Sequence, residues 1–153
     1  MLICRGDLTD PRIIVLLEQH LLRARAQTAP CSAHALDRAA LQGPDISFYA
    51  AWQDLEPLGV GALKRLTDAH GEIKSMYTAE HVRRRGVASA LLRHLLAEAR
   101  AGGMARVSLE TGSWDYFAPA RALYRRHGFI DCSPFADYRP DPNSVFMTLE
   151  LPA

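Results

Sequence analysis

Hydrophobic residues follow two different spacings along this chain, and the way the spacings alternate predicts an α/β (α+β) fold. Short apolar runs are typical of strands, whereas apolar residues three or four positions apart are typical of helices. Strands are predicted at Leu2–Arg5, Ile46–Trp52, Leu58–Leu66, Glu72–Thr78, Ala105–Glu110, Phe129–Ser133 and Ser144–Leu151. Helices are predicted at residues 10–26, Ser32–Leu41, Gly86–Arg100 and residues 119–127. The resulting order is β-α-α-β-β-β-α-β-α-β-β, in which three consecutive strands favour an antiparallel meander.

Composition narrows the class of protein. The 153 residues, 48% of them hydrophobic, are enough to bury one core, so we expect a single domain over residues 1–153. A net charge of +1 argues against a general nucleic-acid binder. No apolar run of signal-peptide or membrane-spanning length occurs, so we expect a cytoplasmic protein with no membrane partner. The three cysteines and the scattered histidines lack metal-ligand spacing and imply free thiols and no metal.

The stretch Arg83–Leu92 carries the strongest functional signal. It follows a predicted strand, begins with three arginines and Gly86, and leads directly into an amphipathic helix. The first turn of a helix has unpaired N–H groups and a positive dipole, and arginine suits phosphate. A Walker loop and a dinucleotide fingerprint are excluded, because the glycines that they require are absent. The stretch therefore predicts a site for a di- or polyphosphate group.

Two motifs in this order resemble the hallmarks of the GNAT superfamily of acyl-CoA N-acetyltransferases. The first is Arg83-x-x-Gly86-x-Ala88, and the second is the run A-x-x-x-Y-x-x-x-G-F that begins at Ala120 and contains Tyr124. The strings E-I-K-S-M-Y and L-E-T-G-S are similar to those of small, single-domain bacterial members. The resemblance implies a mixed, twisted sheet of about seven strands with helices on both faces. It also implies that the fourth and fifth strands splay apart to admit the pantetheine arm of acetyl-CoA.

The resemblance also implies where acetyl-CoA, the co-substrate, would be held. The strand before the phosphate turn supplies backbone groups to pantetheine and one N–H to the thioester carbonyl, at the positions of Met76 and Thr78. A period of two puts Ile73, Ser75 and Tyr77 on one face of this strand, and Glu72, Lys74, Met76 and Thr78 on the other. The expected cofactor contacts are Met76, Tyr77, Thr78, Arg83, Arg84, Arg85, Gly86, Val87, Ala88, Ser89 and Phe117. Phe117 stands where relatives often carry an asparagine.

Three residues are candidates for catalysis. Tyr124 matches the general acid of the family, which reprotonates the sulfur of coenzyme A. Glu72 stands where some relatives carry a general base, and Glu110 ends the neighbouring strand. We rank Tyr124 first, Glu72 second and Glu110 third. His34 in segment 31–37, Glu110, and Tyr138 at the start of the 138–143 loop are the candidates for acceptor binding.

These features predict an enzyme that moves an acetyl group from acetyl-CoA to a primary amine by direct transfer. A small-molecule or amino-acid-like acceptor is preferred, because the sequence contains no obvious charged groove and no targeting extension. A protein lysine or N-terminal acetyltransferase is the first alternative. A non-catalytic acyl-CoA sensor is the second, and the presence of Tyr124 with a plausible base disfavours it. A homodimer is left open.

Overall fold

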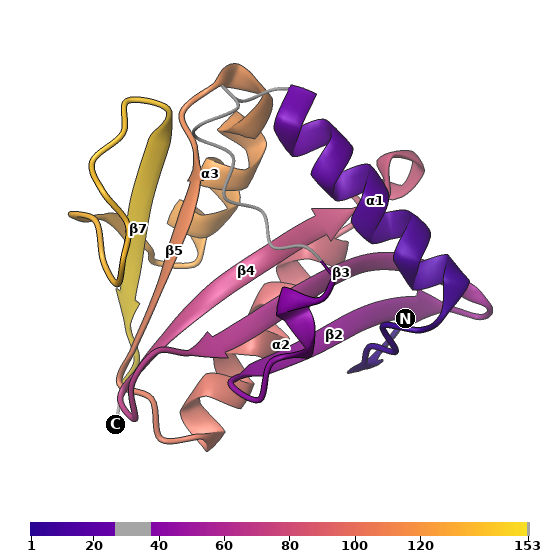
Figure 1. Cartoon of the computed structure of the whole chain (residues 1–153), viewed down its shortest axis with the longest axis horizontal. Coiled ribbons are helices and arrows are strands. Elements are labelled where there is room, and N and C mark those ends of the chain that lie inside the picture. The colour runs from indigo at the N-terminus through magenta and orange to yellow at the C-terminus, as the bar shows by residue number, and fades with distance from the viewer. Residues whose placement is uncertain (27–37, 153) are drawn as a thin grey trace.

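A computed structural model describes residues 1–26 and 38–152 of the chain. Its centre is a seven-stranded sheet with the strand order β1-β2-β3-β4-β5-β7-β6 (Figure 1). The strands are β1 (Leu2–Arg5), β2 (Ile46–Gln53), β3 (Glu56–Arg65), β4 (His70–Thr78), β5 (Arg106–Gly112), β6 (Ile130–Asp131) and β7 (Ser144–Glu150). The helices are α1 (Pro11–Ala26), α2 (Val87–Ala101) and α3 (Ala118–Arg126), with short 3₁₀ turns η2 (Ala40–Gln42), η3 (Glu80–Val82) and η4 (Asp115–Phe117).

This arrangement confirms the predicted mixed fold. Strands β2, β3 and β4 form the expected antiparallel meander, β1 pairs antiparallel with β2 at its edge, and β4 pairs with β5 in parallel. The helix expected at Ser32–Leu41 falls mostly on residues 27–37, which lie outside the described residues. Its last positions contribute to η2 instead of a regular helix.

Helix α2 packs closely on one face of the sheet because β3 carries two glycines there. A Cβ on Gly59 would lie 3.0 Å from Val87, and a Cβ on Gly61 would lie 3.2 Å from Leu95. The apolar stripe of α2 is buried against this face, and each fully buried leucine contributes roughly 1.5–3 kcal/mol. Helix α1 covers the other face, where the ring of His20 lies 5.2 Å from that of Tyr77 (Figure 1).

Strand β4 contains a bulge. Val60 of β3 pairs with Tyr77 and Ala62 pairs with Lys74, so that Gly61 alone faces both Ser75 and Met76. Ser75 has a positive φ of 56°, which is uncommon for a residue with a side chain. One extra residue in a strand breaks its alternation of faces.

The bulge makes the predicted division of faces in this strand wrong. Met76 lies on the α2 face, because its sulfur is 2.7 Å from where a Cβ of Gly61 would be. Ile73 lies on the same face, because it pairs with Leu63, which is two residues after Gly61 in β3. Tyr77 lies on the opposite face beside His20 of α1. Ile73 and Tyr77, expected together, are therefore on opposite faces.

Strands β4 and β5 separate part of the way along their length. They pair only from His70–Ile73 with Arg106–Leu109. Beyond that point β4 stays paired with β3, and β5 stays paired with β7 as far as Gly112. Lys74 and Glu110 are the first residues past the last shared pair, on the face opposite α2. The expected splay of the fourth and fifth strands is confirmed.

Candidate functional site

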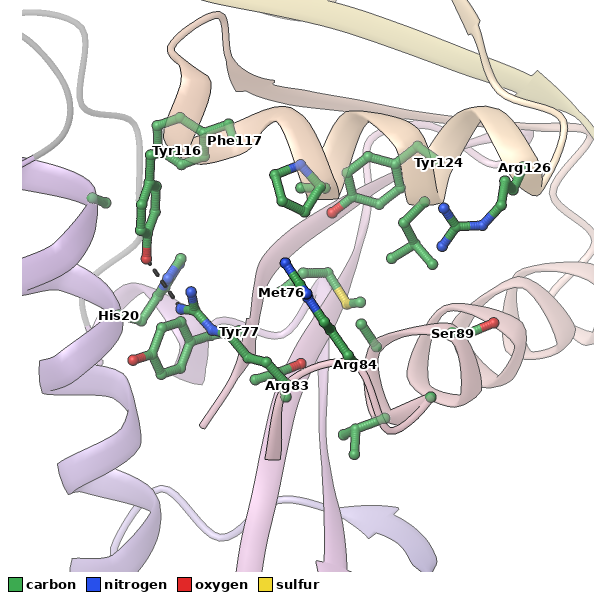
Figure 2. Close-up of a pocket in the computed structure, with 18 residues that line it drawn as sticks. His20, Met76, Tyr77, Arg83, Arg84, Ser89, Tyr116, Phe117, Tyr124 and Arg126 are labelled. Carbon is green, nitrogen blue, oxygen red and sulfur yellow. Dashed lines mark hydrogen bonds between the residues drawn. The ribbon is translucent and has the colours of Figure 1, made fainter. Parts of the chain in front are cut away.

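A cavity of about 380 Å³ lies where the end of β4, the turn before α2 and the η4–α3 segment meet (Figure 2). Its lining contains every residue expected from the sequence to contact the cofactor except Arg85, and it also contains Tyr124. Sequence reasoning missed the remaining lining residues, which are His20, Ala24, Tyr116, Pro119, Ala120, Leu123 and Arg126. The two motifs, distant in sequence, thus form the walls of one cavity.

The turn before α2 has the geometry of an anion site. Gly86 precedes the helix with a φ of 81°, a left-handed conformation that glycine adopts without strain. A Cβ at Gly86 would meet nothing within 4 Å, so the backbone is open on that side. Val87, Ala88 and Ser89 of the first helical turn also line the cavity. Their N–H groups have no partner inside the helix and carry its positive dipole end.

Arg83 has a different setting from the other arginines of the turn. Its guanidinium lies 5.8 Å from the ring centre of Tyr77 and 5.6 Å from that of Tyr116. It also donates a hydrogen bond of 3.2 Å to the Tyr116 hydroxyl (Figure 2). Cation–π contacts of this kind contribute about 0.5–1 kcal/mol at exposed sites. Arg83 therefore links the end of β4 to η4 across one end of the cavity.

Phe117 is held in the cavity wall by Gly112. Its ring occupies the space where a Cβ at Gly112 would be, so any larger residue there would displace the ring. Arg121 fixes the same segment by donating hydrogen bonds to the carbonyl oxygens of Gly112, at 2.6 Å, and Trp114, at 2.9 Å. The position of Phe117 thus depends on the end of β5.

Tyr124 projects from α3 with its hydroxyl directed into the cavity (Figure 2). The residue is only 6% exposed, and its ring packs edge-on against Phe129 at 5.8 Å. Burial, with a smaller contribution from the negative charge of Glu110, raises the pKa of the phenol well above its usual value. Tyr124 is consequently a proton donor at neutral pH.

Glu72 is enclosed by partners on the face opposite α2. The residue is 2% exposed, and its carboxylate accepts hydrogen bonds from Tyr138, at 2.6 Å, and from Lys74, at 3.0 Å. Lys74 also donates to the Tyr138 hydroxyl at 2.9 Å. Glu72 and Tyr138, expected to serve as base and acceptor contact, are joined to each other. Neither lines the cavity.

Glu110 has the electrostatic environment of a proton acceptor at neutral pH. Burial raises the pKa of its carboxyl to about 7, against opposing effects of Ser144 and the positive charge of Lys74. It lies on β5 at the first position past the shared pairs with β4, on the same face as Glu72. A carboxyl with this pKa is ionised in about half of the molecules at pH 7.

His34 lies in residues 27–37, outside the described residues. Among residues 1–26 and 38–152, no group of three or more histidine, cysteine, aspartate or glutamate side chains could hold a metal ion. No helix in this part of the chain is long and apolar enough to cross a membrane.

Comparison with known proteins decides the family. The profile described as the Acetyltransferase (GNAT) family matches residues 16–129. This chain belongs to the GNAT family. Proteins similar to it include the Bacillus subtilis protein named uncharacterized N-acetyltransferase YsnE, which is 50% identical over 95% of this chain and 96% of the relative's length. Uncharacterized N-acetyltransferase YedL of Escherichia coli is 48% identical over 95% of this chain and 91% of its own.

Solved structures agree with this GNAT assignment. An acyl-CoA N-acyltransferase from Klebsiella pneumoniae is 31% identical, with a TM-score of 0.79 over 98% of this chain and 97% of its own. An aminoglycoside 6′-N-acetyltransferase with coenzyme A bound shares the fold at 15% identity, with a TM-score of 0.75 over 100% of this chain and 99% of its own. The chain is a GNAT N-acetyltransferase, an enzyme of a fold that binds acetyl-CoA.

Proposed function

We propose that this GNAT enzyme transfers the acetyl group of acetyl-CoA to the primary amine of a small or amino-acid-like molecule. The observation that carries the proposal is the cavity that connects the Gly86 turn to the Tyr124 hydroxyl beside the split between β4 and β5. An anion site at one part of the cavity and a buried proton donor at another suit a long substrate with phosphates and a thioester at opposite ends.

Acetyl-CoA supplies an activated acetyl group as its thioester. In this proposal the turn at Arg83–Ser89 binds the pyrophosphate through backbone N–H groups, with Arg84 directed into the cavity. The edge of β4 beyond Ile73 has no strand partner in β5. Backbone N–H groups on this edge, at Met76 or Thr78, are then available to stabilise the developing oxyanion.

Two residues would handle the protons. A neutral amine attacks the carbonyl carbon, a C–N bond forms, and the C–S bond then breaks. The proton lost by the amine goes to the Glu110 carboxylate, directly or through water, and the Tyr124 hydroxyl gives a proton to the departing thiolate. Tyr124 lies with Met76 in the cavity lining, and Glu110 lies on the opposite face of the sheet at the split. Donor and acceptor substrates can therefore approach from opposite sides.

We favour Glu110 over Glu72 as the general base. Glu72 already accepts two hydrogen bonds, one from the ammonium group of Lys74 and one from the hydroxyl of Tyr138, so its carboxylate is engaged with other side chains. Glu110 instead has a pKa raised to about 7 by burial, which suits proton transfer near neutral pH. Glu72 is better understood as the group that fixes Lys74 and Tyr138.

The name of one relative supports a small acceptor. IAA acetyltransferase of Azospirillum brasilense is 39% identical over 140 residues, which cover 90% of each chain. We propose that residues 1–153 act as one catalytic domain in a reducing cytoplasm, in agreement with the free thiols of Cys4 and Cys132. A protein acceptor is the competing candidate, since the fold also matches ribosomal-protein-S18-alanine N-acetyltransferase of Escherichia coli at 21% identity, with a TM-score of 0.73 over 97% of this chain and 92% of its own.

The proposal is tested by measuring thiol release from acetyl-CoA with a panel of amino acids, amines and aromatic amines, beside peptides with a free N-terminus or lysine. Acceptor-dependent thiol release with a small amine, and an acetylated product of the expected mass, would support it. Turnover with peptides alone would transfer the assignment to protein acetylation. Binding of acetyl-CoA without turnover on any acceptor would contradict the proposed reaction.

A further inference from the structure

The chain contains only two lysines, Lys64 and Lys74, against sixteen arginines. A lysine side chain ends in a primary amine, the kind of group that this enzyme is proposed to acetylate. The guanidinium of arginine stays charged at all working pH values and is not an acceptor. Two side-chain amines are therefore present in the whole chain, and one of them lies beside the split between β4 and β5.

Lys74 occupies a position next to the proposed reaction centre. It is the first residue of β4 past the pairs shared with β5, and Glu110 holds the matching position on β5. The positive charge of Lys74 is near enough to Glu110 to lower the pKa of its carboxyl. Met76 lines the cavity from the α2 face, and Tyr77 lines it from the opposite face, where Lys74 lies. The cavity therefore reaches both faces of the sheet at the end of β4.

The amine of Lys74 is held by two neighbours. Its Nζ donates hydrogen bonds to the Glu72 carboxylate, at 3.0 Å, and to the Tyr138 hydroxyl, at 2.9 Å. The Nζ also lies 5.4 Å from the centre of the Tyr138 ring, and the side chain is 10% exposed. The nitrogen must give up one of these hydrogen bonds, and a proton, before it can attack an acyl group. Glu72 and Tyr138 thus control when this amine is available.

We propose that Lys74 is a self-acetylation site, at which the enzyme transfers the acetyl group of acetyl-CoA to its own chain. The inference rests on the proposed function, in which the thioester reaches the split between β4 and β5. One ammonium proton leaves to water, the nitrogen attacks the carbonyl carbon and a C–N bond forms. The C–S bond then breaks, the nitrogen loses a second proton to Glu110, and the thiolate takes a proton from Tyr124. The proton on Glu110 finally restores Tyr124.

Acetylation would change the acceptor side of the split. The amide that forms has no charge and keeps a single N–H donor. Glu72, which is 2% exposed, would lose its ionic partner, and breaking a buried pair in this way is destabilising. Glu110 would lose the positive charge beside it. We expect the modified enzyme to work more slowly. Because a bound acceptor competes for the same thioester, self-acetylation would limit activity when acetyl-CoA is abundant and the acceptor is scarce.

The experiment incubates the full chain with acetyl-CoA and no acceptor, and follows the acetyl group on each lysine by peptide mass spectrometry. Lys74 should be acetylated ~10-fold or more faster than Lys64, because only Lys74 is held close to the thioester. Lys64 is a matched internal control. It pairs with Glu72 in the register of β3 and β4 and shares its face, but it lies one strand further from the split.

Two variants test the control of the amine and its consequence. Tyr138→Phe removes one of the two hydrogen bonds of Lys74 and should raise its rate of acetylation about 10-fold. Lys74→Arg keeps a charged donor for Glu72 and Tyr138 and has no amine to acetylate. The parent should lose activity during preincubation with acetyl-CoA, in step with the acetyl group on Lys74. Lys74→Arg should keep its own starting activity.

The outcomes separate this inference from the proposed function. Equal rates at Lys64 and Lys74 would show that acetyl-CoA reacts with any lysine, and would overturn the inference. Thiol release with an added amine, while Lys74 stays unmodified in the parent and in Tyr138→Phe, would also overturn it and leave the proposed function intact. An equal loss of activity in the parent and Lys74→Arg would overturn the effect on activity. A parent that acetylates neither Lys74 nor any amine would overturn the proposed function itself.

Discussion

The hydroxyl of Tyr138 donates a hydrogen bond of 2.6 Å to Glu72, a residue 66 positions earlier in the chain. This contact fastens the loop before β7 onto β4, on the face opposite α2. It also gives the buried carboxylate of Glu72 a second hydrogen-bond donor beside Lys74, and buried charges need such partners in a protein interior. The local structure around the split between β4 and β5 therefore depends on a pair of residues that are not expected to react.

Replacing Tyr138 by phenylalanine should reduce stability. The substitution removes one hydrogen bond to a buried charged group and one to Lys74, so we expect the free energy of unfolding to fall by about 1.5–3 kcal/mol. Urea denaturation measures this change. Tyr116→Phe is the control, because its bond to Arg83 is exposed and its loss should cost about 0–1 kcal/mol. Equal stability of the Tyr138 variant and the parent would contradict a structural role for this bond.

Replacing Glu110 by glutamine should remove the acid limb of the activity profile. The base form of a carboxyl with a pKa of about 7 accumulates as pH rises through 7, so kcat/KM of the parent should rise across this range. The variant should lose ~100-fold in kcat/KM at pH 8 and lack this limb. Glu72→Gln should retain the limb. A limb that instead disappears in Glu72→Gln would return the role of base to Glu72.

The Glu110→Gln variant also tests the raised pKa of Glu110, through the pH dependence of protein stability. Because the pKa in the folded state is raised above the ordinary value of 4.5, ionisation opposes folding. The associated stability is present below pH 4.5 and is lost as pH rises through about 7. Thermal unfolding at pH 5 and pH 8 should therefore show Glu110→Gln gaining stability relative to the parent at the higher pH. A constant difference between the two proteins would contradict the raised pKa.

Replacing Tyr124 by phenylalanine should affect turnover more than binding. The variant keeps the buried ring and its contact with Phe129 and loses one hydroxyl. We expect kcat to fall on the order of 10–100-fold, with the dissociation constant for coenzyme A changed little. Steady-state kinetics and calorimetry separate these effects. Unchanged turnover on the best acceptor would make Tyr124 a packing residue.

Gly86→Val should weaken coenzyme A binding far more than it weakens the fold. The new side chain would point into open space beside the turn, where we place the pyrophosphate. Gly103→Val is a close control, because Gly103 has a φ of 80°, against 81° for Gly86, and likewise meets no atom within 4 Å. Both variants carry the strain of a left-handed residue, about 1–2 kcal/mol. Similar coenzyme A affinities for the two folded variants would place the phosphate elsewhere.

Local sequence rules predicted the parts of this fold that depend on neighbouring residues. The order of strands along the chain follows from hydrophobic spacing, and the turn before α2 follows from Gly86, a residue that adopts the left-handed conformation without strain. The prediction of which β4 side chains share a face was wrong, because the bulge at Ser75 arises from pairing with β3 and the residue type gives no sign of it.

Long-range contacts account for what the sequence did not predict in the site. Glu72 is a plausible base from its place in a strand, and only the folded chain brings Tyr138 onto it. In the sequence, Phe117 indicates only that the asparagine common in relatives is missing. The folded chain shows that its ring packs against Gly112, in the space that a Cβ would need. Arg126 and Ser89 stand in different motifs, and their meeting across one cavity depends on how α2 and α3 pack.

The bulge at Ser75 limits how this chain can change in length. Before it, even-numbered residues such as Glu72 and Lys74 face away from α2, whereas after it the even-numbered Met76 faces α2 and Tyr77 faces away. Deleting Ser75 would remove the bulge and restore simple alternation, and Met76 and Tyr77 would stay opposite Gly61 and Val60 on their present faces. Deleting Tyr77 instead would bring Met76 opposite Val60, on the face away from α2. The place at which this segment loses a residue therefore decides which side of the sheet the Met76 side chain occupies.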